Sequence, residues 1–163
     1  MYTNTTSFSL RRFVCADFAD ICAMSQKVYH GDVIRRMTML FSSDSTPHFN
    51  WLIEKGHREL IEAVELIKNG KQESFKWLID NKHFEVAAFA NAVRGDKNAF
   101  RWLMNNKSVF WAATANAVNK DKQAMAWLRH NNFIVYADLA QAIIEWESLD
   151  NDDFSGYYRG PIS

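Results

Sequence analysis

Histidines, carboxylates and arginines are the side chains of this sequence that could carry out chemistry, but they do not stand at the spacings that known reactions use. The five histidines form no H-E-x-x-H pair of the kind that holds zinc, and the two cysteines lie apart from them. No glycine-rich phosphate loop and no G-x-S-x-G nucleophile turn is present. We therefore expect a protein that is not an enzyme and has no catalytic residue, metal site or cofactor.

One group of charged residues near the N-terminus remains a candidate ligand site. His30, Arg35 and Arg36 fall outside the regular pattern that organises the rest of the chain. They would lie where an N-terminal cap meets the first regular unit, together with four further charged residues: Arg11, Arg12, Asp17 and Asp20. The alternative hypothesis for function is therefore a small-ligand-binding protein or an enzyme with its site at this junction.

Four copies of a short motif organise the remainder of the chain. The motif is an aromatic residue or methionine, any residue, tryptophan and leucine, and its tryptophans are Trp51, Trp77, Trp102 and Trp127. They follow one another in steps of 26, 25 and 25 residues. Each copy precedes a second block, which reads "LIEAVELI", "VAAFANAV", "WAATANAV" and "YADLAQAI" in turn. Two linked blocks that keep their order over four copies predict a tandem repeat.

Both blocks have the apolar spacing of helices, and the loops between them are short. The loops read "EKG", "DNK", "NNK" and "HNN", which forces the two helices of a unit antiparallel. Asp44, Asp96 and Asp121 are expected to cap the first helices, and Gly56, Asn81, Asn106 and Asn131 to end them in the left-handed conformation. We predict an all-α fold of tandem two-helix repeats of about 25 residues, stacked as a short α-solenoid with N-terminal capping helices.

The two-helix unit resembles those of the tetratricopeptide, ankyrin and leucine-rich variant repeat families in its architecture. Its period is shorter than the roughly 33 to 34 residues of the first two families, and the T-P-L-H signature of ankyrin is absent. The resemblance therefore implies stacked helical hairpins and carries no functional residue over to this chain.

The predicted organisation is a single all-α domain over residues 1–147 followed by a flexible acidic tail over residues 148–163. Capping helices occupy residues 9–42, with one helix over 9–28 and another over 32–41, and four helical hairpins occupy residues 45–146. Each repeat tryptophan lies on an apolar stripe that must be buried. We therefore expect Trp102 to belong to the core and Trp102→Ala to cost about 3–5 kcal/mol.

Residues inside the second helices are the candidates for binding a partner. Asn91, Asn116 and Gln141 interrupt alanine-rich helices, where they could either fix the register of the repeats or line a concave face. Trp111 and Tyr136 could mark a groove on that face or pack in the core. The predicted function is a non-catalytic helical-repeat protein that acts as a protein-protein interaction or scaffolding module, with another protein or a second copy as its partner.

Charge and composition exclude several other classes of function. Lysine plus arginine equals aspartate plus glutamate, at 19 each, so no net field attracts the chain to nucleic acid or to an anionic membrane. A basic row that includes Lys68 and Arg94 is interleaved with acids and is interpreted as solvated. No apolar run has the length of a membrane helix, and the N-terminus lacks a signal-peptide pattern. We expect a soluble, cytoplasmic protein that binds neither nucleic acid nor membranes.

Overall fold

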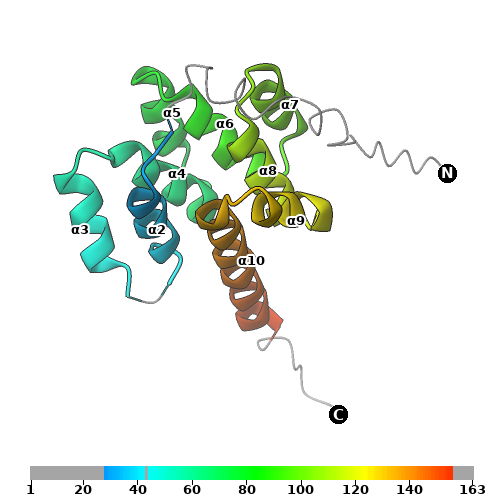
Figure 1. Cartoon of the computed structure of the whole chain (residues 1–163). Coiled ribbons are helices and arrows are strands. Elements are labelled where there is room, and N and C mark those ends of the chain that lie inside the picture. Colours follow the sequence, from blue (N-terminus) through cyan, green and yellow to red (C-terminus); the bar gives the residue numbers. More distant parts are fainter. Residues whose placement is uncertain (1–27, 43, 156–163) are drawn as a thin grey trace, which may run out of the picture.

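The regular structure is helical in every part of the chain that the structure describes. A computed structural model describes residues 28–42 and 44–155, with side chains as far as residue 150. The capping helix predicted over residues 9–28 lies almost wholly outside these ranges. The helices, shown in Figure 1, are α2 (Gly31–Met39), α3 (Thr46–Glu54), α4 (Arg58–Asn69), α5 (Gln72–Asp80), α6 (Phe84–Val93), α7 (Lys97–Asn105), α8 (Val109–Val118), α9 (Lys122–His130) and α10 (Ile134–Ser155). The all-α prediction is confirmed.

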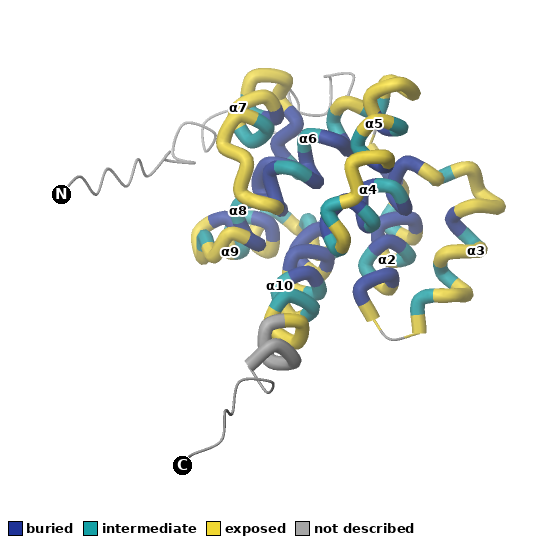
Figure 2. The backbone as a smooth tube through the Cα atoms, turned by 180° about the vertical axis from the view of Figure 1, so that it is seen from behind, coloured by how far each residue is buried: buried dark blue, intermediate teal, exposed yellow. Residues whose placement is uncertain are grey.

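The helices alternate between two environments. We call α2, α4, α6, α8 and α10 the inner helices and α3, α5, α7 and α9 the outer helices. Each outer helix packs against the inner helix that precedes it and, less extensively, against the one that follows it, and the inner helices α4, α6, α8 and α10 pack against one another in chain order. Figure 2 shows the inner helices largely buried and the outer helices largely exposed. Alanine is frequent in α6 and α8, and its small side chain lets neighbouring helices approach closely.

The row of inner helices returns on itself, because its last member packs against its first. A Cβ atom built on Gly31, at the start of α2, would lie 3.7 Å from Val135 at the start of α10. The ring centroids of Phe41, which follows α2, and Trp146 in α10 are 6.0 Å apart. Because both the starts and the later parts of the two helices adjoin, α2 and α10 run parallel. The inner faces of the helices are therefore covered by one another.

Long polar side chains tie the C-terminal ends of neighbouring inner helices together. Lys68 Nζ donates to the Leu40 carbonyl at 3.3 Å, and Arg94 Nη1 donates to the Leu66 carbonyl at 2.9 Å. Asn119 Nδ2 repeats the arrangement with the carbonyl of Ala92 at 3.0 Å. The carbonyls of Leu66 and Ala92 also accept from the backbone N–H groups of Gly70 and Gly95 at 3.0 Å each, so the side-chain bonds are second bonds to these oxygens and link one inner helix to the next. The interpretation of Lys68 and Arg94 as a solvated row is wrong, since both bond to the preceding inner helix.

The predicted caps are confirmed for α7 and α9, but Asp44 does not cap α3, whose N-cap is Ser45. At the ends of the outer helices Gly56 is left-handed as predicted, and in the other three hairpins the left-handed residue stands one position later than predicted. Asp96 Oδ1 accepts from the backbone N–H groups of Asn98 and Ala99 at 2.8 and 3.2 Å, and Asp121 caps α9 in the same way. The left-handed residues at the ends are Gly56, Lys82, Lys107 and Asn132, with φ between 60° and 76°. Asn81, Asn106 and Asn131 stand one residue earlier and each donates Nδ2–H to the carbonyl of the repeat tryptophan at 2.8 Å.

The leucine of each Trp-Leu pair, and not the tryptophan, occupies the core. Leu103 is fully buried, as are the corresponding leucines Leu52, Leu78 and Leu128. Trp102 is 36% exposed, and the other three repeat tryptophans are half-buried. Successive residues of a helix point about 100° apart, so when leucine faces the inner helix its neighbour reaches only the edge of the interface. The expectation that Trp102 belongs to the core is wrong.

The last inner helix is longer than the others and passes the predicted end of the domain. α10 has 22 residues and continues from Ile134 to Ser155, whereas the flexible tail was predicted to begin at residue 148. The first part of the predicted tail is therefore helical, and the remainder of it lies beyond the described residues.

Candidate functional site

The two aromatic candidates, for which the sequence leaves a groove or the core open, lie in the core. Trp111 and Tyr136 are each 4% exposed, and their rings meet edge to face with centroids 5.5 Å apart. Trp111 also contacts Phe89 at 4.5 Å and Tyr29 at 6.0 Å. These rings fill the space between the first turns of the inner helices. Their burial agrees with the packing role and not with a groove.

Within the described residues, the three candidate amides do not hydrogen-bond to one another. Asn91 and Asn116 are half-buried, and within the described residues neither side chain makes a hydrogen bond. Gln141 is exposed and donates to Glu145 on its own helix at 2.9 Å. The sequence left open whether these amides fix the register between repeats. In the structure, neighbouring inner helices are linked instead by the bonds from Lys68, Arg94 and Asn119 described above.

Two carboxylates lie at the starts of inner helices next to the buried aromatic rings. Tyr29 Oη donates to Glu59 Oε1 at 3.0 Å, and Ser108 Oγ donates to Glu85 Oε1 at 2.6 Å. Both carboxylates are in the first turn of a helix, where the helix dipole favours negative charge. Burial and the nearby Glu59 raise the pKa of Tyr29, and burial followed by the charge of Glu85 raises the pKa of Tyr136 to about 12.

A histidine adjoins this group without bonding to it. His57 Nδ1 is buried, lies 3.6 Å from Glu59 Oε1 and has no hydrogen bond within the described residues. The edge of the Tyr29 ring packs against the imidazole at 5.9 Å between centroids. Tyr29 and Ser108 donate directly to the two carboxylates, so polar side chains at the starts of the inner helices hydrogen-bond to one another. The arrangement is that of a polar junction which holds the inner helices together.

Two of the three residues predicted as a ligand site meet at one carboxylate, since His30 Nδ1 lies 3.3 Å from Asp32 Oδ2 and Arg35 pairs with Asp32 Oδ1, whereas Arg36 lies apart from them. His30 stands at the start of α2 with 80% of its side chain exposed, and its Nδ1 accepts from the backbone N–H of Asp32 at 3.4 Å. Arg35 extends back along α2 and pairs with Asp32 at 2.9 Å. Arg36 points instead toward α3, where it meets His48 Nδ1 at 3.1 Å. The described residues also contain no group of three or more His, Cys, Asp or Glu side chains that could hold a metal.

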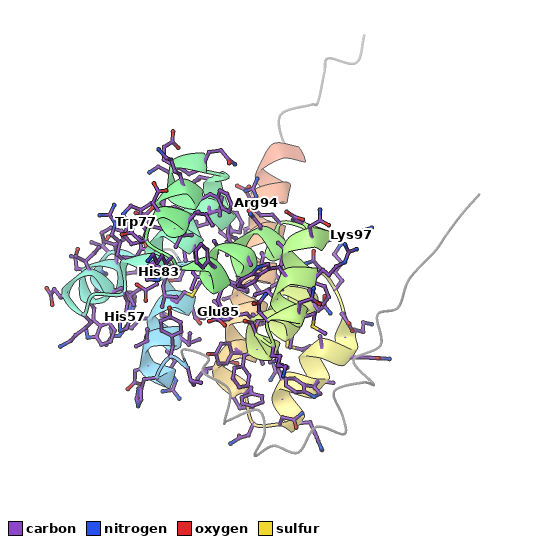
Figure 3. All side chains as sticks on the ribbon, turned by 90° about the horizontal axis from the view of Figure 1, so that it is seen from above. His57, Trp77, His83, Glu85, Arg94 and Lys97 are labelled. Atoms are coloured by element: carbon purple, nitrogen blue, oxygen red, sulfur yellow. The ribbon has the colours of Figure 1, made fainter. Side chains whose placement is uncertain are left out.

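The repeat tryptophans form a second group of aromatic residues, on the outer side of the molecule. The imidazole of His83 stacks on Trp77 at 5.6 Å and 12°, and the two side chains lie next to each other in Figure 3. The guanidinium of Arg58 also lies over the Trp77 ring, 4.7 Å from its centroid. Trp127 stacks on Phe133 at 5.6 Å, and the guanidinium of Arg36 lies 5.2 Å from the ring of Trp51. Three of the four indoles are thus covered by a neighbouring side chain.

Trp102 differs from the other three because its covering residues are replaced. Ser108 stands where His83 stands in the preceding repeat, and its hydroxyl turns inward to Glu85. Phe84, the first residue of α6, corresponds to Arg58, the first residue of α4, and is 46% exposed. We call Phe84 and Trp102, with the exposed bases Lys82 and Arg101 beside them in sequence, the Trp102 surface.

Sequence reasoning missed the Trp102 surface because it treated all four tryptophans alike. The signal that could have found it lies in the residues around the motif. One position of the repeat holds His57, His83, Ser108 and Phe133 in turn, and Ser108 in the third repeat is the only small side chain of the four. A comparison of the repeats column by column would have singled out the tryptophan that lacks a cover.

Comparison with protein-family models, with curated proteins and with solved structures finds no match to this chain. Among the described residues, no helix has both the length and the apolar character needed to cross a membrane.

Proposed function

We propose that this protein is a non-catalytic helical-repeat module that binds another protein, and that it does so through the Trp102 surface. The observation that carries the proposal is the exposure of Trp102 in a series where the corresponding indoles are covered. Large aromatic side chains cost free energy when they face water, and tryptophan is among the residues that contribute most to protein interfaces. An indole that is 36% exposed, in a repeat whose Phe84 is exposed at the position of the covering Arg58, is therefore best explained by a partner that covers both.

The proposed fold is a short α-solenoid of tandem hairpins that has curled until its first and last inner helices meet. The bonds from Lys68, Arg94 and Asn119 support it, because corresponding residues make corresponding contacts at successive junctions. A curled stack of this kind covers its concave side with its own helices. The outer helices then remain as the surface on which a partner can dock.

The test is affinity capture from a native lysate with matched variants. Wild-type protein, the double variant Phe84→Ser/Trp102→Ser and the control variant Phe49→Ser are compared. Phe49 is an exposed aromatic residue of α3, so its removal controls for a general loss of surface apolarity. We expect the control to capture the same proteins as the wild type and the double variant to lose them at an unchanged melting temperature. Equal capture by all three proteins would reject the Trp102 surface as the binding site.

A further inference from the structure

We infer that the partner at the Trp102 surface is a second copy of this chain, whose acidic, aromatic segment at the end of α10 docks there. This inference rests on the proposed function and names its partner. The segment, residues 150–158, reads "DNDDFSGYY" and combines three aspartates with three aromatic residues. It offers the two chemistries that a basic, aromatic surface can bind.

Charge is distributed unevenly over a chain that is neutral as a whole. From Ile134 to Tyr158 there is no lysine or arginine, and the acids are Asp138, Glu145, Glu147, Asp150, Asp152 and Asp153. Along α5, α7, α9 and the turns beside them, bases outnumber acids. These bases are Lys71, Lys76, Lys82, Lys97, Arg101, Lys107, Lys120, Lys122 and Arg129, against Glu73, Asp80, Asp96 and Asp121. Opposite charge at two ends of one molecule steers one copy toward another.

Covalent geometry prevents the segment from reaching the Trp102 surface of its own chain. Trp102 lies less than one turn before Asn105, where α7 ends and the chain turns into α8. α10 begins at this same end of the molecule, because the rings of Phe110 and Phe133 are 4.4 Å apart. The 22 residues of α10 then carry the chain about 33 Å away, to Ser155. Figure 1 shows α7 and the C-terminal end of α10 at opposite ends of the molecule.

The aromatic residues that follow α10 cannot span this distance. Tyr157 and Tyr158 follow Ser155 by two and three residues, and three residues reach about 10 Å at full extension. A contact between these tyrosines and Trp102 therefore requires two molecules. Stacking of a tyrosine on the exposed indole, with aspartates beside Arg101 and Lys82, would cover the surface in the way that His83 and Arg58 cover Trp77.

Sedimentation equilibrium of the full chain tests this inference. The proteins are the wild type, the surface variant Phe84→Ser/Trp102→Ser, the segment variant Tyr157→Ser/Tyr158→Ser and the control Phe49→Ser. We expect the weight-average mass of the wild type and the control to rise with concentration and to fall when salt is added. Each of the other two variants should lose at least about tenfold in association constant, because aromatic anchors dominate interface energies.

Mixing the two defective variants makes the test specific. The surface variant keeps an intact segment and the segment variant keeps an intact surface, so an equimolar mixture should form a 1:1 complex that neither forms alone. A wild type that stays monomeric at millimolar concentration would overturn the inference. So would a segment variant that associates like the wild type.

The outcome is separable from that of the proposed function. If the wild type is monomeric but capture of a different protein depends on Phe84 and Trp102, the surface binds another partner and only the present inference fails. If capture does not depend on them either, the proposed function fails as well.

Discussion

The adjacent tryptophan and leucine of the repeat motif lie in different environments, because successive residues of a helix point in different directions. In the pair Trp102-Leu103 the leucine is fully buried, whereas the indole is more than one third exposed. The sequence predicts the apolar stripe to which both belong, because their spacing is helical. It could not predict which of the two faces the inner helix, since that depends on the rotation of α7 against α6 and α8. This rotation is a property of the packed helices and not of α7 alone.

In a protein core, Trp→Ala usually lowers the free energy of unfolding at least as much as Leu→Ala. For Trp102 and Leu103 we predict the opposite order. Leu103→Ala should lower the free energy of unfolding by about 2–5 kcal/mol, because it empties a filled core position. Trp102→Ala should cost less than Leu103→Ala, because 36% of Trp102 already faces water whereas Leu103 is fully buried. Urea unfolding of both variants against the wild type measures this difference. A cost for Trp102→Ala as large as that for Leu103→Ala would mean that the indole is a core residue after all.

The buried tyrosine of α10 should make stability depend on alkaline pH. The pKa of Tyr136 is raised to about 12, whereas an unfolded tyrosine titrates near about 10. Between these two values the folded state binds more protons than the unfolded state. The free energy of unfolding therefore falls as the pH rises from about 10 to about 12, and the contribution is fully present below pH 10.

Replacing the phenol separates this effect from the titration of lysines. Tyr136→Phe should unfold with a shallower loss of stability than the wild type across this pH range, as measured by urea unfolding at successive pH values. The ultraviolet absorbance of ionised tyrosine should also lose a component that titrates near pH 12. Identical pH profiles for the two proteins would show that Tyr136 is accessible to solvent.

At the scale of single helices, the sequence predicts a side-chain bond correctly where the two bonded residues are close together in the chain. Asp96 and Asp121 cap the helices they precede because a carboxylate at that position meets free N–H groups of the same helix. The bonds from Lys68, Arg94 and Asn119 join residues 27 or 28 positions apart. Nothing near Arg94 in the sequence indicates its partner, so its role became visible only with the helices in place.

The guanidinium of Arg94 should contribute to the junction of α4 and α6. Arg94→Met keeps most of the aliphatic chain but removes the bond to the Leu66 carbonyl, so we expect a loss of about 1–2 kcal/mol in the free energy of unfolding. Arg94→Lys is the matched control, because Lys68 makes the corresponding bond to Leu40. Thermal or urea unfolding should place the lysine variant between the wild type and the methionine variant. A methionine variant as stable as the wild type would show that the bond adds nothing.

At the scale of the whole molecule, the sequence predicts the alternation of helices but not the meeting of α2 with α10. The hairpins follow from short loops and helical periodicity, both of which are local. The closing contacts, such as that between Phe41 and Trp146, join distant residues and depend on small rotations added at every junction. Trp111 and Tyr136, for which the sequence leaves both a groove and the core open, are buried for this reason.

The proposed binding function requires the outer helices, because the inner helices cover one another, and a cross-linker on an outer helix tests this proposal most directly. A photo-reactive benzophenone amino acid is introduced at position 102 in one protein and at position 77 in another, and each is irradiated in a native lysate. Trp77 is the matched position because Arg58 and His83 cover it. We predict a defined cross-linked protein from position 102 that position 77 does not give. No product from position 102, or the same products from both positions, would contradict the account.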